Sequence, residues 1–262
     1  MSEANDFRKL ALVSSDSERA QEALGSLRRL HDWVPMEEAD AVVVLGGDGF
    51  MLHVLHSMLD SKRLIPAYGM NRGTVGFLMN RDRGGAKLLE RVNDARGFTI
   101  NPLKCEAFTQ TGESCRMSAI NEVSLLRETR QTAKIEISVD ERVRIDELVC
   151  DGVLVSTPAG STAYNLSANG PILPLDSKLL ALTPISPFRP RRWSGAVLPD
   201  RSTLQFRIRE PSKRPVSVVA DQKELRDVAE VHVEVDKDTR LTLLFDEGHS
   251  LDERIAAEQF MV

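Results

Sequence analysis

The sequence predicts an α/β domain followed by an all-β domain within 262 residues. Up to about residue 98, short apolar runs alternate with segments of helical periodicity, which is typical of a parallel sheet with helical crossovers. Beyond that point helical periodicity disappears and short strands of alternating polarity take over. We therefore predict a Rossmann-like domain over residues 1–99 and a β-sandwich-like domain over residues 100–239, with residues 240–262 returning to the first domain.

The α/β part begins with a short apolar strand and a helix opened by the capping-box pattern Ser15-Asp16-Ser17-Glu18. The uninterrupted apolar run Ala41–Leu45 is rich in valine and predicts a strand buried on both faces. Apolar residues from Met51 to Leu59 then recur at helical spacing. The expected strands cover residues 10–13, 41–45 and 64–69, and the expected helices cover residues 15–30, 51–59 and 86–96.

The β part shows period-two alternation most clearly in Ala133–Val139. The stretch Thr183–Trp193 is rich in proline and arginine and is predicted to be a surface loop. At the end of the chain, Leu251, Ile255 and Phe260 recur at roughly helical spacing and are expected to pack on the first domain. The expected strands are residues 133–139, 143–151, 153–156, 204–208, 216–219, 231–235 and 241–245.

The composition is that of an ordinary globular protein, with 42% hydrophobic and 28% charged residues. A net charge of −5 argues against a nucleic-acid or acidic-membrane surface. Three cysteines without a Cys-x-x-Cys pair argue against a disulfide framework. The sequence has no apolar run of about 20 residues and no evident signal peptide, so a cytoplasmic location is expected.

Three glycines surround one carboxylate in the turn Gly46-Gly47-Asp48-Gly49. In an open α/β sheet this turn lies at the carboxyl edge of the strands, where ligands bind, and amides at a helix start favour a phosphate. Gly46, Gly47 and Gly49 are therefore candidate phosphate-binding residues. A carboxylate repels a phosphate unless a metal or a reacting hydroxyl lies between them, which makes Asp48 a candidate catalytic residue. The alternative is a turn aspartate that only accepts backbone hydrogen bonds.

Two polar stretches in the β part are candidates for ligand binding. Asn121-Glu122 combines an amide with a carboxylate that suit the hydroxyls of a ribose, although an ordinary edge-strand pair is the alternative. The run Asp151–Pro171 mixes small hydroxyls, exposed amides and the ring of Tyr164, the groups needed to hold a purine. Its alternative is a polar connection that satisfies its own backbone.

The histidines give no metal cage. His53 and His56 lie on the helix after the glycine turn and lack the His-Glu-x-x-His arrangement of a zinc site. We expect both on the helix surface, with His53 one turn from Asp48 and within reach of a ligand. No metal site is expected from protein ligands alone.

Taken together, Gly46–Gly49, Asn71–Phe77, Asn121-Glu122 and Ser156–Tyr164 resemble the NAD kinases in order and spacing. The match runs from the strand before Asp48 to about Gln222. Lipid kinases and 6-phosphofructokinases look similar at the Gly-Gly-Asp-Gly turn, whereas the Thr-Pro-x-Gly-Ser-Thr-Ala-Tyr segment is more specific to NAD kinases. The family's architecture, an α/β domain and a β-sandwich-like domain, agrees with the pattern of elements.

The resemblance implies transfer of the γ-phosphoryl group of ATP, or of polyphosphate, to the 2′-hydroxyl of the adenosine ribose of NAD, giving NADP. It implies Mg²⁺ or another divalent cation and a homo-oligomer, either a dimer or a tetramer. Asp48 would accept the hydroxyl proton. The expected NAD-binding residues are Asp48, Gly49, His53, Phe77, Asn121, Glu122, Asp151, Ala159, Thr162, Ala163, Tyr164, Asn165, Leu166, Ser167 and Gln222.

Within that set the resemblance divides the work. It implies that Asn121 and Glu122 hold the ribose and diphosphate region, that Asp151 lies near the nicotinamide end and that 162–167 binds adenine. The chain departs from the family at Phe50, where a small polar residue is usual, at Ala159, where Thr is common, and at His53, where Arg often stands. Phe50 removes a hydroxyl that would suit a phosphate.

Two alternative functions fit parts of the sequence. A lipid or sugar kinase would share only the glycine turn, and the Thr162-Ala163-Tyr164 segment and the absence of a basic amphipathic helix argue against it. A non-catalytic NAD(P)-binding sensor would be expected to lose the carboxylate of the turn, whereas Asp48 is present.

Overall fold

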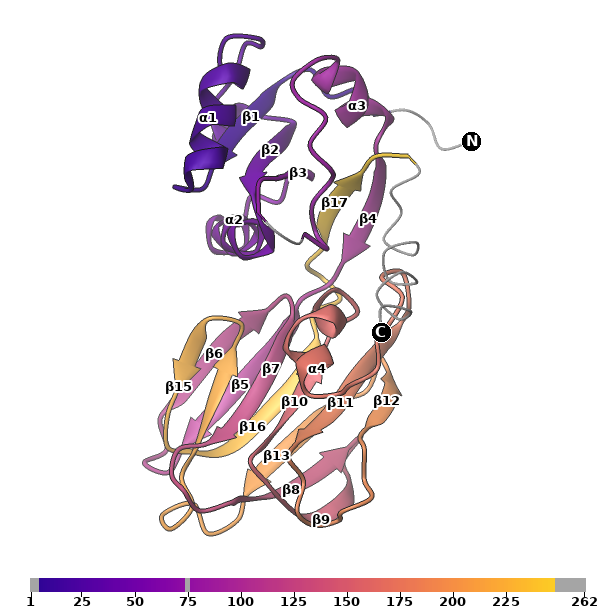
Figure 1. Ribbon diagram of the computed structural model, residues 1–262. Coiled ribbons are helices and arrows are strands. Elements are labelled where there is room, and N and C mark those ends of the chain that lie inside the picture. The colour runs from indigo at the N-terminus through magenta and orange to yellow at the C-terminus, as the bar shows by residue number, and fades with distance from the viewer. Residues whose placement is uncertain (1–4, 74–75, 248–262) are drawn as a thin grey trace. The chain divides into compact units, whose positions relative to one another are not determined.

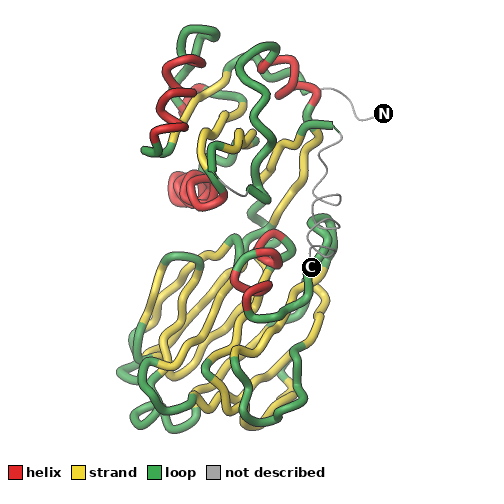
Figure 2. Tube along the Cα trace, in the orientation of Figure 1, coloured by secondary structure: helices red, strands yellow, loops and turns green. Residues whose placement is uncertain are grey.

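A computed structural model describes residues 5–73 and 76–247 of the chain (Figure 1). The chain divides into two compact units, one formed by Met1–Ile100 with Arg240–Val262 and the other by Asn101–Thr239. Most of the helical residues belong to the first unit, and the second is built largely of strands (Figure 2). The α/β plus all-β fold class is therefore confirmed. The expected helical segment with Leu251, Ile255 and Phe260 lies outside the described residues.

The first unit is built on a five-stranded sheet of order β1-β2-β3-β17-β4. The first four strands in that order run parallel, and β4 runs antiparallel beside β17, so the sheet is mixed rather than wholly parallel. β17 comes from the far end of the chain and pairs with both β3 and β4 (Figure 1). The strands are β1 (Leu10–Ser14), β2 (Ala41–Gly46), β3 (Ala67–Asn71), β4 (Arg96–Ile100) and β17 (Leu241–Phe245).

The apolar run that follows Asp40 forms β2, and all six of its residues are buried. Its neighbours β1 and β3 cover both edges, and the valines fill the interior, which explains why this strand has no polar face. Helix α2 then buries an apolar stripe that includes Met51, Leu55 and Met58. The helices are α1 (Glu18–Leu27), the short 3₁₀ helix η1 (Met36–Glu38), α2 (Asp48–Ser61) and α3 (Leu88–Asp94).

Several predicted boundaries in this unit are corrected. The α1 capping box does not form, because the Ser17 hydroxyl lies 3.1 Å from the Ser15 hydroxyl and caps no backbone amide. The helix ends at Leu27 rather than Leu30. α3 is shorter than predicted, since Ala95 is already extended and Arg96 begins β4. β3 begins at Ala67 rather than Leu64.

The second unit consists of two antiparallel six-stranded sheets. One has the order β12-β11-β10-β7-β14-β15 and the other β6-β5-β16-β13-β8-β9. The strands of the first are β7 (Glu122–Arg127), β10 (Gly152–Ser156), β11 (Leu179–Ile185), β12 (Ala196–Pro199), β14 (Val216–Ala220) and β15 (Lys223–Leu225). Those of the second are β5 (Leu103–Thr109), β6 (Ser114–Ala119), β8 (Ala133–Val139), β9 (Arg142–Cys150), β13 (Leu204–Ile208) and β16 (Val228–Val235).

One apolar cluster drawn from both sheets forms the core of this unit, with Phe206, Leu125 and Ile137 among its fully buried members. Period-two patterning produces it, because alternate residues of each strand point inward. The predicted loop 183–193 is partly wrong: β11 extends to Ile185, and Thr183 is buried within it. Two short helical segments, η2 (Ala159–Thr162) and α4 (Tyr164–Ser167), follow β10.

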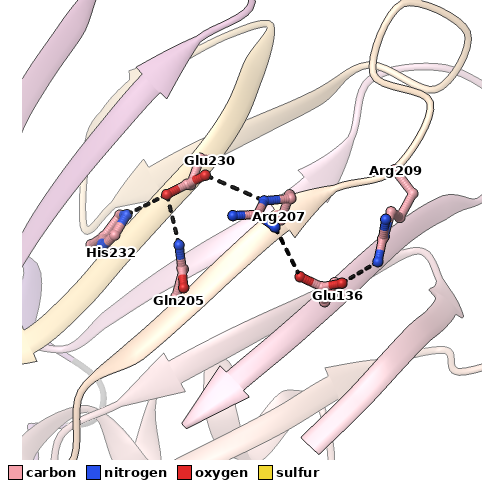
Figure 3. A network of polar contacts seen from close by, with 6 residues as sticks. All are labelled: Glu136, Gln205, Arg207, Arg209, Glu230 and His232. Carbon is pink, nitrogen blue, oxygen red and sulfur yellow. Dashed lines mark hydrogen bonds and ion pairs between the residues drawn. The ribbon is translucent and has the colours of Figure 1, made fainter. Parts of the chain in front are cut away.

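The outward face of the second sheet carries a polar network. Glu136 accepts from Arg207 and Arg209, and Glu230 accepts from Gln205 and from Arg207, while His232 lies 2.6 Å from the same Glu230 carboxylate (Figure 3).

A groove of about 850 Å³ lies on this sheet, and its lining includes Lys104, Glu106, Arg116, Gln205, His232 and Asp236. Its charges largely pair with one another, as in Lys104 with Asp236 and Arg116 with Glu106. It contains none of the predicted site residues, so the candidate site lies elsewhere.

Candidate active site

The candidate site of the first unit is the turn between β2 and α2. β2 ends at Gly46, Gly47 has extended backbone angles and caps the helix, and Asp48 is the first residue of α2. The strand-turn-helix geometry predicted for the glycine stretch is therefore confirmed. Because β2 is an inner strand of the parallel part of the sheet, this turn lies at the carboxyl edge, where open α/β sheets bind ligands.

Two backbone amides hold the carboxylate of Asp48. The Phe77 amide donates to Oδ2 at 2.8 Å and the Leu78 amide donates to Oδ1 at 2.9 Å. Each oxygen therefore has its own donor, which fixes the plane of the carboxylate as well as its position. Phe77, predicted from the sequence to contact a ligand, is thus adjacent to Asp48 through its backbone.

The segment that supplies these amides is itself anchored. Asn80 is fully buried, and its side-chain amide donates to the carbonyls of Gly69 at 3.0 Å and Leu244 at 2.9 Å. Its carbonyl oxygen accepts from the Asp246 amide at 2.8 Å. Asn80 therefore anchors the segment that contains Phe77 and Leu78 to β3 and to the end of β17. Sequence reasoning did not single out Asn80, because its partners lie as many as 166 positions away.

The glycines of the turn differ in what a side chain would meet. A Cβ on Gly46 would lie 2.9 Å from the Cβ of Phe50, so the fold itself needs glycine there. A Cβ on Gly49 would meet no atom of the described residues within 4 Å, and Gly49 is exposed. The structure also accounts for Phe50: its ring covers Gly46 and stacks on the ring of His53 at 6.2 Å between centroids.

A second candidate site is formed in the second unit, around Asn121 and Glu122 at the start of β7. The carboxylate of Asp221 accepts three consecutive amides there, from Ile120 at 2.6 Å, Asn121 at 3.0 Å and Glu122 at 3.2 Å. Thr157, just beyond β10, binds from the other side: its amide donates to the Asn121 carbonyl at 2.9 Å and its hydroxyl to the Ile120 carbonyl at 2.7 Å.

Asp221 and Thr157 thus hold the backbone of residues 120–122 from two sides, and Gly160 adds a third close contact. A Cβ on Gly160 would overlap the backbone of Asn121, so only glycine allows the polar segment after β10 to approach so closely. The Gly160 amide also donates to the Thr157 hydroxyl at 3.1 Å. The structure therefore brings Asn121, Glu122 and the segment containing 159–167 together. That they form one binding site stays a prediction.

Burial and the charge of Asp221 raise the pKa of Glu122 to about 8. Glu122 is therefore mainly protonated at neutral pH and can donate a hydrogen bond to a ligand as well as accept one. Its Oε2 atom and the Oδ1 atom of Asn121 are buried and have no hydrogen-bond partner among the described residues. Burial, with the charges of Glu122 and Asp151, also raises the pKa of Tyr164.

The raised pKa of Glu122 predicts a pH-dependent stability. The folded chain keeps the Glu122 proton up to about pH 8, whereas the unfolded chain releases it near the ordinary value of 4.5. The stabilising contribution of Glu122 is therefore fully present below pH 4.5. It is lost as the pH rises from there through about 8. Relative to Glu122→Gln, the wild type should lose free energy of unfolding across this window in urea titrations. Parallel pH profiles of the two proteins would contradict the prediction.

The remaining predicted residues separate into two groups. Asn165 is fully buried; its amide donates to the carbonyls of Ser161 and Pro171, and its oxygen accepts from Thr183. Both ends of the Asn165 side chain are therefore engaged within the chain, where they support the segment. A contact of Asn165 with NAD stays a prediction. Ala159 is buried as well, whereas Thr162, Ala163, Tyr164, Leu166, Ser167 and Gln222 are partly or fully exposed.

Asp151 forms an ion pair with Arg127 at 2.6 Å, at the end of β7 opposite to Glu122. Arg127 and Asp221 contact predicted site residues, and sequence reasoning selected neither of them. The available signal was the pair Asp221-Gln222 at a predicted strand end, where an aspartate commonly accepts backbone amides.

Within the described residues, no group of three or more His, Cys, Asp or Glu side chains is arranged to hold a metal ion. No helix within 5–73 and 76–247 is both long and apolar enough to span a bilayer.

Comparison with known proteins adds independent findings. A family model described as the ATP-NAD kinase C-terminal domain matches residues 120–245. The NAD kinase of Rhizorhabdus wittichii is 61% identical over 97% of this chain and 99% of its own length. The NAD kinase of Zymomonas mobilis is 58% identical over 97% of this chain and 98% of its own.

Solved structures resemble the fold. Yeast NADH kinase complexed with NADH has a TM-score of 0.82 at 21% identity, covering 96% of this chain and 87% of that chain. An NAD kinase from Archaeoglobus fulgidus in complex with ATP has a TM-score of 0.77 at 24% identity, covering 96% of this chain and 98% of that chain. At these identities the likeness concerns the fold alone.

Proposed function

This chain belongs to the NAD kinase family, and on that premise we propose that Asp48 is its catalytic base. In the proposed reaction Asp48 accepts the proton of the 2′-hydroxyl of the adenosine ribose of NAD. The oxygen of that hydroxyl then bonds to the γ-phosphorus of ATP, the bond to the β-phosphate bridge breaks, and NADP and ADP leave. The main observation behind the proposal is that the Phe77 and Leu78 amides each donate a hydrogen bond to one oxygen of the Asp48 carboxylate.

Phosphoryl transfer depends mainly on positioning and on electrostatic stabilisation, with one group orienting the attacking hydroxyl. A carboxylate free to rotate would sample many orientations, whereas one held by an amide on each oxygen meets the hydroxyl in a single one. The alternative of a turn aspartate that only supports its own turn fits less well, because its donors come from residues 29 and 30 positions away.

The glycine turn is proposed to receive the phosphates. Gly46 is accounted for by Phe50, but nothing in the described chain explains why residue 49 lacks a side chain. Open space at the first turn of a helix lets an anion approach the backbone amides, and a methyl group there would occupy that approach. Gly49, with Gly47, is therefore assigned to phosphate binding.

Gly49→Ala is accordingly expected to fold normally, with up to about 1 kcal/mol of added helix stability, but to lose about tenfold or more in kcat/KM for ATP. Gly25→Ala is the matched control: Gly25 lies in α1 and is exposed, and a methyl group added to it would also meet nothing within 4 Å. The control should gain stability and keep full activity. Wild-type kinetics for Gly49→Ala would remove Gly49 from the phosphate site.

In the second unit, the ribose and diphosphate of NAD are proposed to bind Asn121, Glu122 and Gln222. The adenine is proposed to bind Thr162, Ala163, Tyr164, Leu166 and Ser167, with Ala159 beside them. The protonated state of Glu122 supports this assignment, because a neutral acid does not repel a diphosphate. Asp151, paired with Arg127, is proposed to lie near the nicotinamide end. His53 and Phe77 are proposed to contact NAD beside Asp48.

A divalent cation, Mg²⁺ by preference, is proposed to enter with ATP. Mg²⁺ is commonly held by one or two carboxylates together with substrate phosphates and water, and the described chain offers one carboxylate, Asp48, in the glycine turn. The donor set therefore fits a metal held chiefly by the nucleotide. When bound, the ion neutralises phosphate charge beside Asp48.

The test is formation of NADP from NAD, read with an NADP-specific dehydrogenase. We expect product with ATP and Mg²⁺, and its loss when the metal is chelated. Polyphosphate in place of ATP, and NADH in place of NAD, define the donor and the redox form. No NADP with any donor or metal would favour a non-catalytic NAD(P)-binding protein, and phosphorylation of a diacylglycerol or a sugar in preference to NAD would favour the remaining alternative. A homo-oligomer and a cytoplasmic location complete the proposal.

A further inference from the structure

We infer that Asp221 is a positioning residue for NAD binding, whose carboxylate holds the backbone of residues 120–122 so that Asn121 and Glu122 meet the ligand in one geometry. The inference rests on the proposed role of Asn121 and Glu122 in binding NAD. Asp221 itself need not touch the nucleotide.

The geometry of the contact carries the inference. Three successive amides, from Ile120, Asn121 and Glu122, converge on one carboxylate at 2.6, 3.0 and 3.2 Å. Successive amides that point to one side form a concave anion-binding backbone, and here the anion is a side chain of the same protein. The Asp221 amide donates in return to the Glu122 carbonyl at 3.1 Å. The two backbone segments are therefore locked to each other.

The turn that carries Asp221 is built for this contact. Asp221 follows β14, whose last residue Ala220 pairs with Val123, so the turn lies directly beside Glu122. Its φ of 51° is in the left-handed region, which Asp and Asn tolerate better than other side chains. On the other flank, Ser156 of β10 pairs with Glu122, and Thr157 holds the Asn121 carbonyl. Glu122 is thus fixed from both neighbouring strands.

The side chains of Asn121 and Glu122 indicate why their backbone is held so firmly. The backbone of Asn121 and Glu122 is hydrogen-bonded on both flanks. In contrast, Oδ1 of Asn121 and Oε2 of Glu122 are buried and find no hydrogen-bond partner within 5–73 and 76–247. Buried polar atoms are ordinarily paired, and exceptions call for an explanation such as a ligand. A rigid backbone that carries unpaired polar side-chain atoms is the arrangement expected of a preorganised binding pair.

The competing explanation is that Asp221 only stabilises the fold. Asp140 is a suitable control for that explanation. Asp140 also has a φ of 51°, and its carboxylate accepts the Thr203 amide at 3.0 Å and the Ser202 hydroxyl at 3.4 Å. It lies in the β8–β9 turn of the same unit, away from the predicted site residues. Asp140→Asn therefore reports what an aspartate of this kind contributes to folding alone.

The experiment compares Asp221→Asn and Asp221→Gly with Asp140→Asn. Asparagine and glycine both tolerate the left-handed backbone, so the turn should form; asparagine keeps one carbonyl acceptor and glycine keeps none. We expect KM for NAD to rise by about 5- to 30-fold for Asp221→Asn and further for Asp221→Gly, with a smaller change in kcat. Asp140→Asn should leave KM unchanged at a comparable loss in urea midpoint.

A second readout separates positioning from folding. The groups whose charges couple to Glu122 are Asp221, from the β14–β15 turn, and Tyr164, from α4. Removing the Asp221 charge should shift the pH dependence of KM for NAD to lower pH, because Glu122 then ionises more readily. Asp140→Asn should leave that profile in place, because Asp221, and not Asp140, is the charge that raises the pKa of Glu122.

Asn121→Ala and Glu122→Gln serve as benchmarks for the site. If both raise KM for NAD while both Asp221 variants keep wild-type KM and pH profile, the inference is wrong and the proposed binding pair stands. If neither benchmark changes KM, the proposed pair is wrong and the inference falls with it. Equal KM changes in Asp221→Asn and Asp140→Asn would also overturn the inference.

Discussion

Asp48→Asn is expected to lower kcat by about 10²–10⁴-fold while NAD still binds, because the variant keeps the shape of the side chain and loses the proton acceptor. Asparagine can accept from only one of the Phe77 and Leu78 amides, and its NH₂ group would face the other. The effect should therefore appear in kcat, measured at saturating NAD and ATP, with the dissociation constant for NAD measured separately by calorimetry.

Asp60→Asn is the matched control for this substitution. Asp60 lies in the last turn of the same helix, α2, so its replacement makes the same chemical change at a distance from the glycine turn. The kcat of this variant should stay close to that of the wild type. Near-wild-type turnover of Asp48→Asn would show that Asp48 is not the base, whatever the family of the chain.

Gly160→Ala is expected to raise KM for NAD by about tenfold or more. The added methyl group would overlap the carbonyl oxygen, carbonyl carbon and Cα of Asn121, none of which moves without disturbing the contacts of Thr157 and Asp221. Overpacking of this kind costs about 1–3 kcal/mol, and here the strain falls on the backbone of a proposed ligand-binding residue. Steady-state kinetics at varied NAD measure the effect directly.

Gly195→Ala distinguishes loss of binding from loss of stability. Its methyl group would press on the Leu182 carbonyl, and its φ of +109° disfavours any side chain, so the stability cost should be at least as large. Gly195 lies outside the predicted site, and KM for NAD should not change. If Gly160→Ala binds NAD as the wild type does, the close approach to Asn121 has no part in recognition.

Local signals explain what the sequence predicts correctly about the fold. The β2 strand, the glycine turn and α2 follow one another within 41–61, and each depends on its own residues: valines for a doubly buried strand, glycines for the turn, apolar spacing for the helix. The all-β region is recognisable from the same kind of local pattern.

The errors have equally specific causes. Pro184 makes 183–193 resemble a loop, yet it lies in β11 beyond Leu179–Leu182, the part that pairs with β12, so it removes no ladder hydrogen bond on that side. β6 escapes prediction because its sequence, Ser-Cys-Arg-Met-Ser-Ala, contains no β-branched or aromatic residue.

The candidate site shows the same division between local and distant information. Asp48 is recognisable from its flanking glycines, but the amides that orient it come from Phe77 and Leu78. Asn121 and Glu122 are recognisable as an unusual pair, but the carboxylate that clamps them lies about a hundred positions further on, at Asp221. Groups that react or bind can be found by type, whereas groups that position them depend on the tertiary fold.

The most direct test of the proposed mechanism follows the phosphorus atom. The protein is incubated with NAD, Mg²⁺ and ATP that carries a radioactive γ-phosphate, and the products are separated and treated with a phosphatase and an NADP-specific dehydrogenase. We expect one labelled phosphate per NADP formed, attached to the 2′-oxygen of the adenosine ribose, and no such transfer by Asp48→Asn. Label found only in inorganic phosphate, or on another position of NAD, would contradict the mechanism.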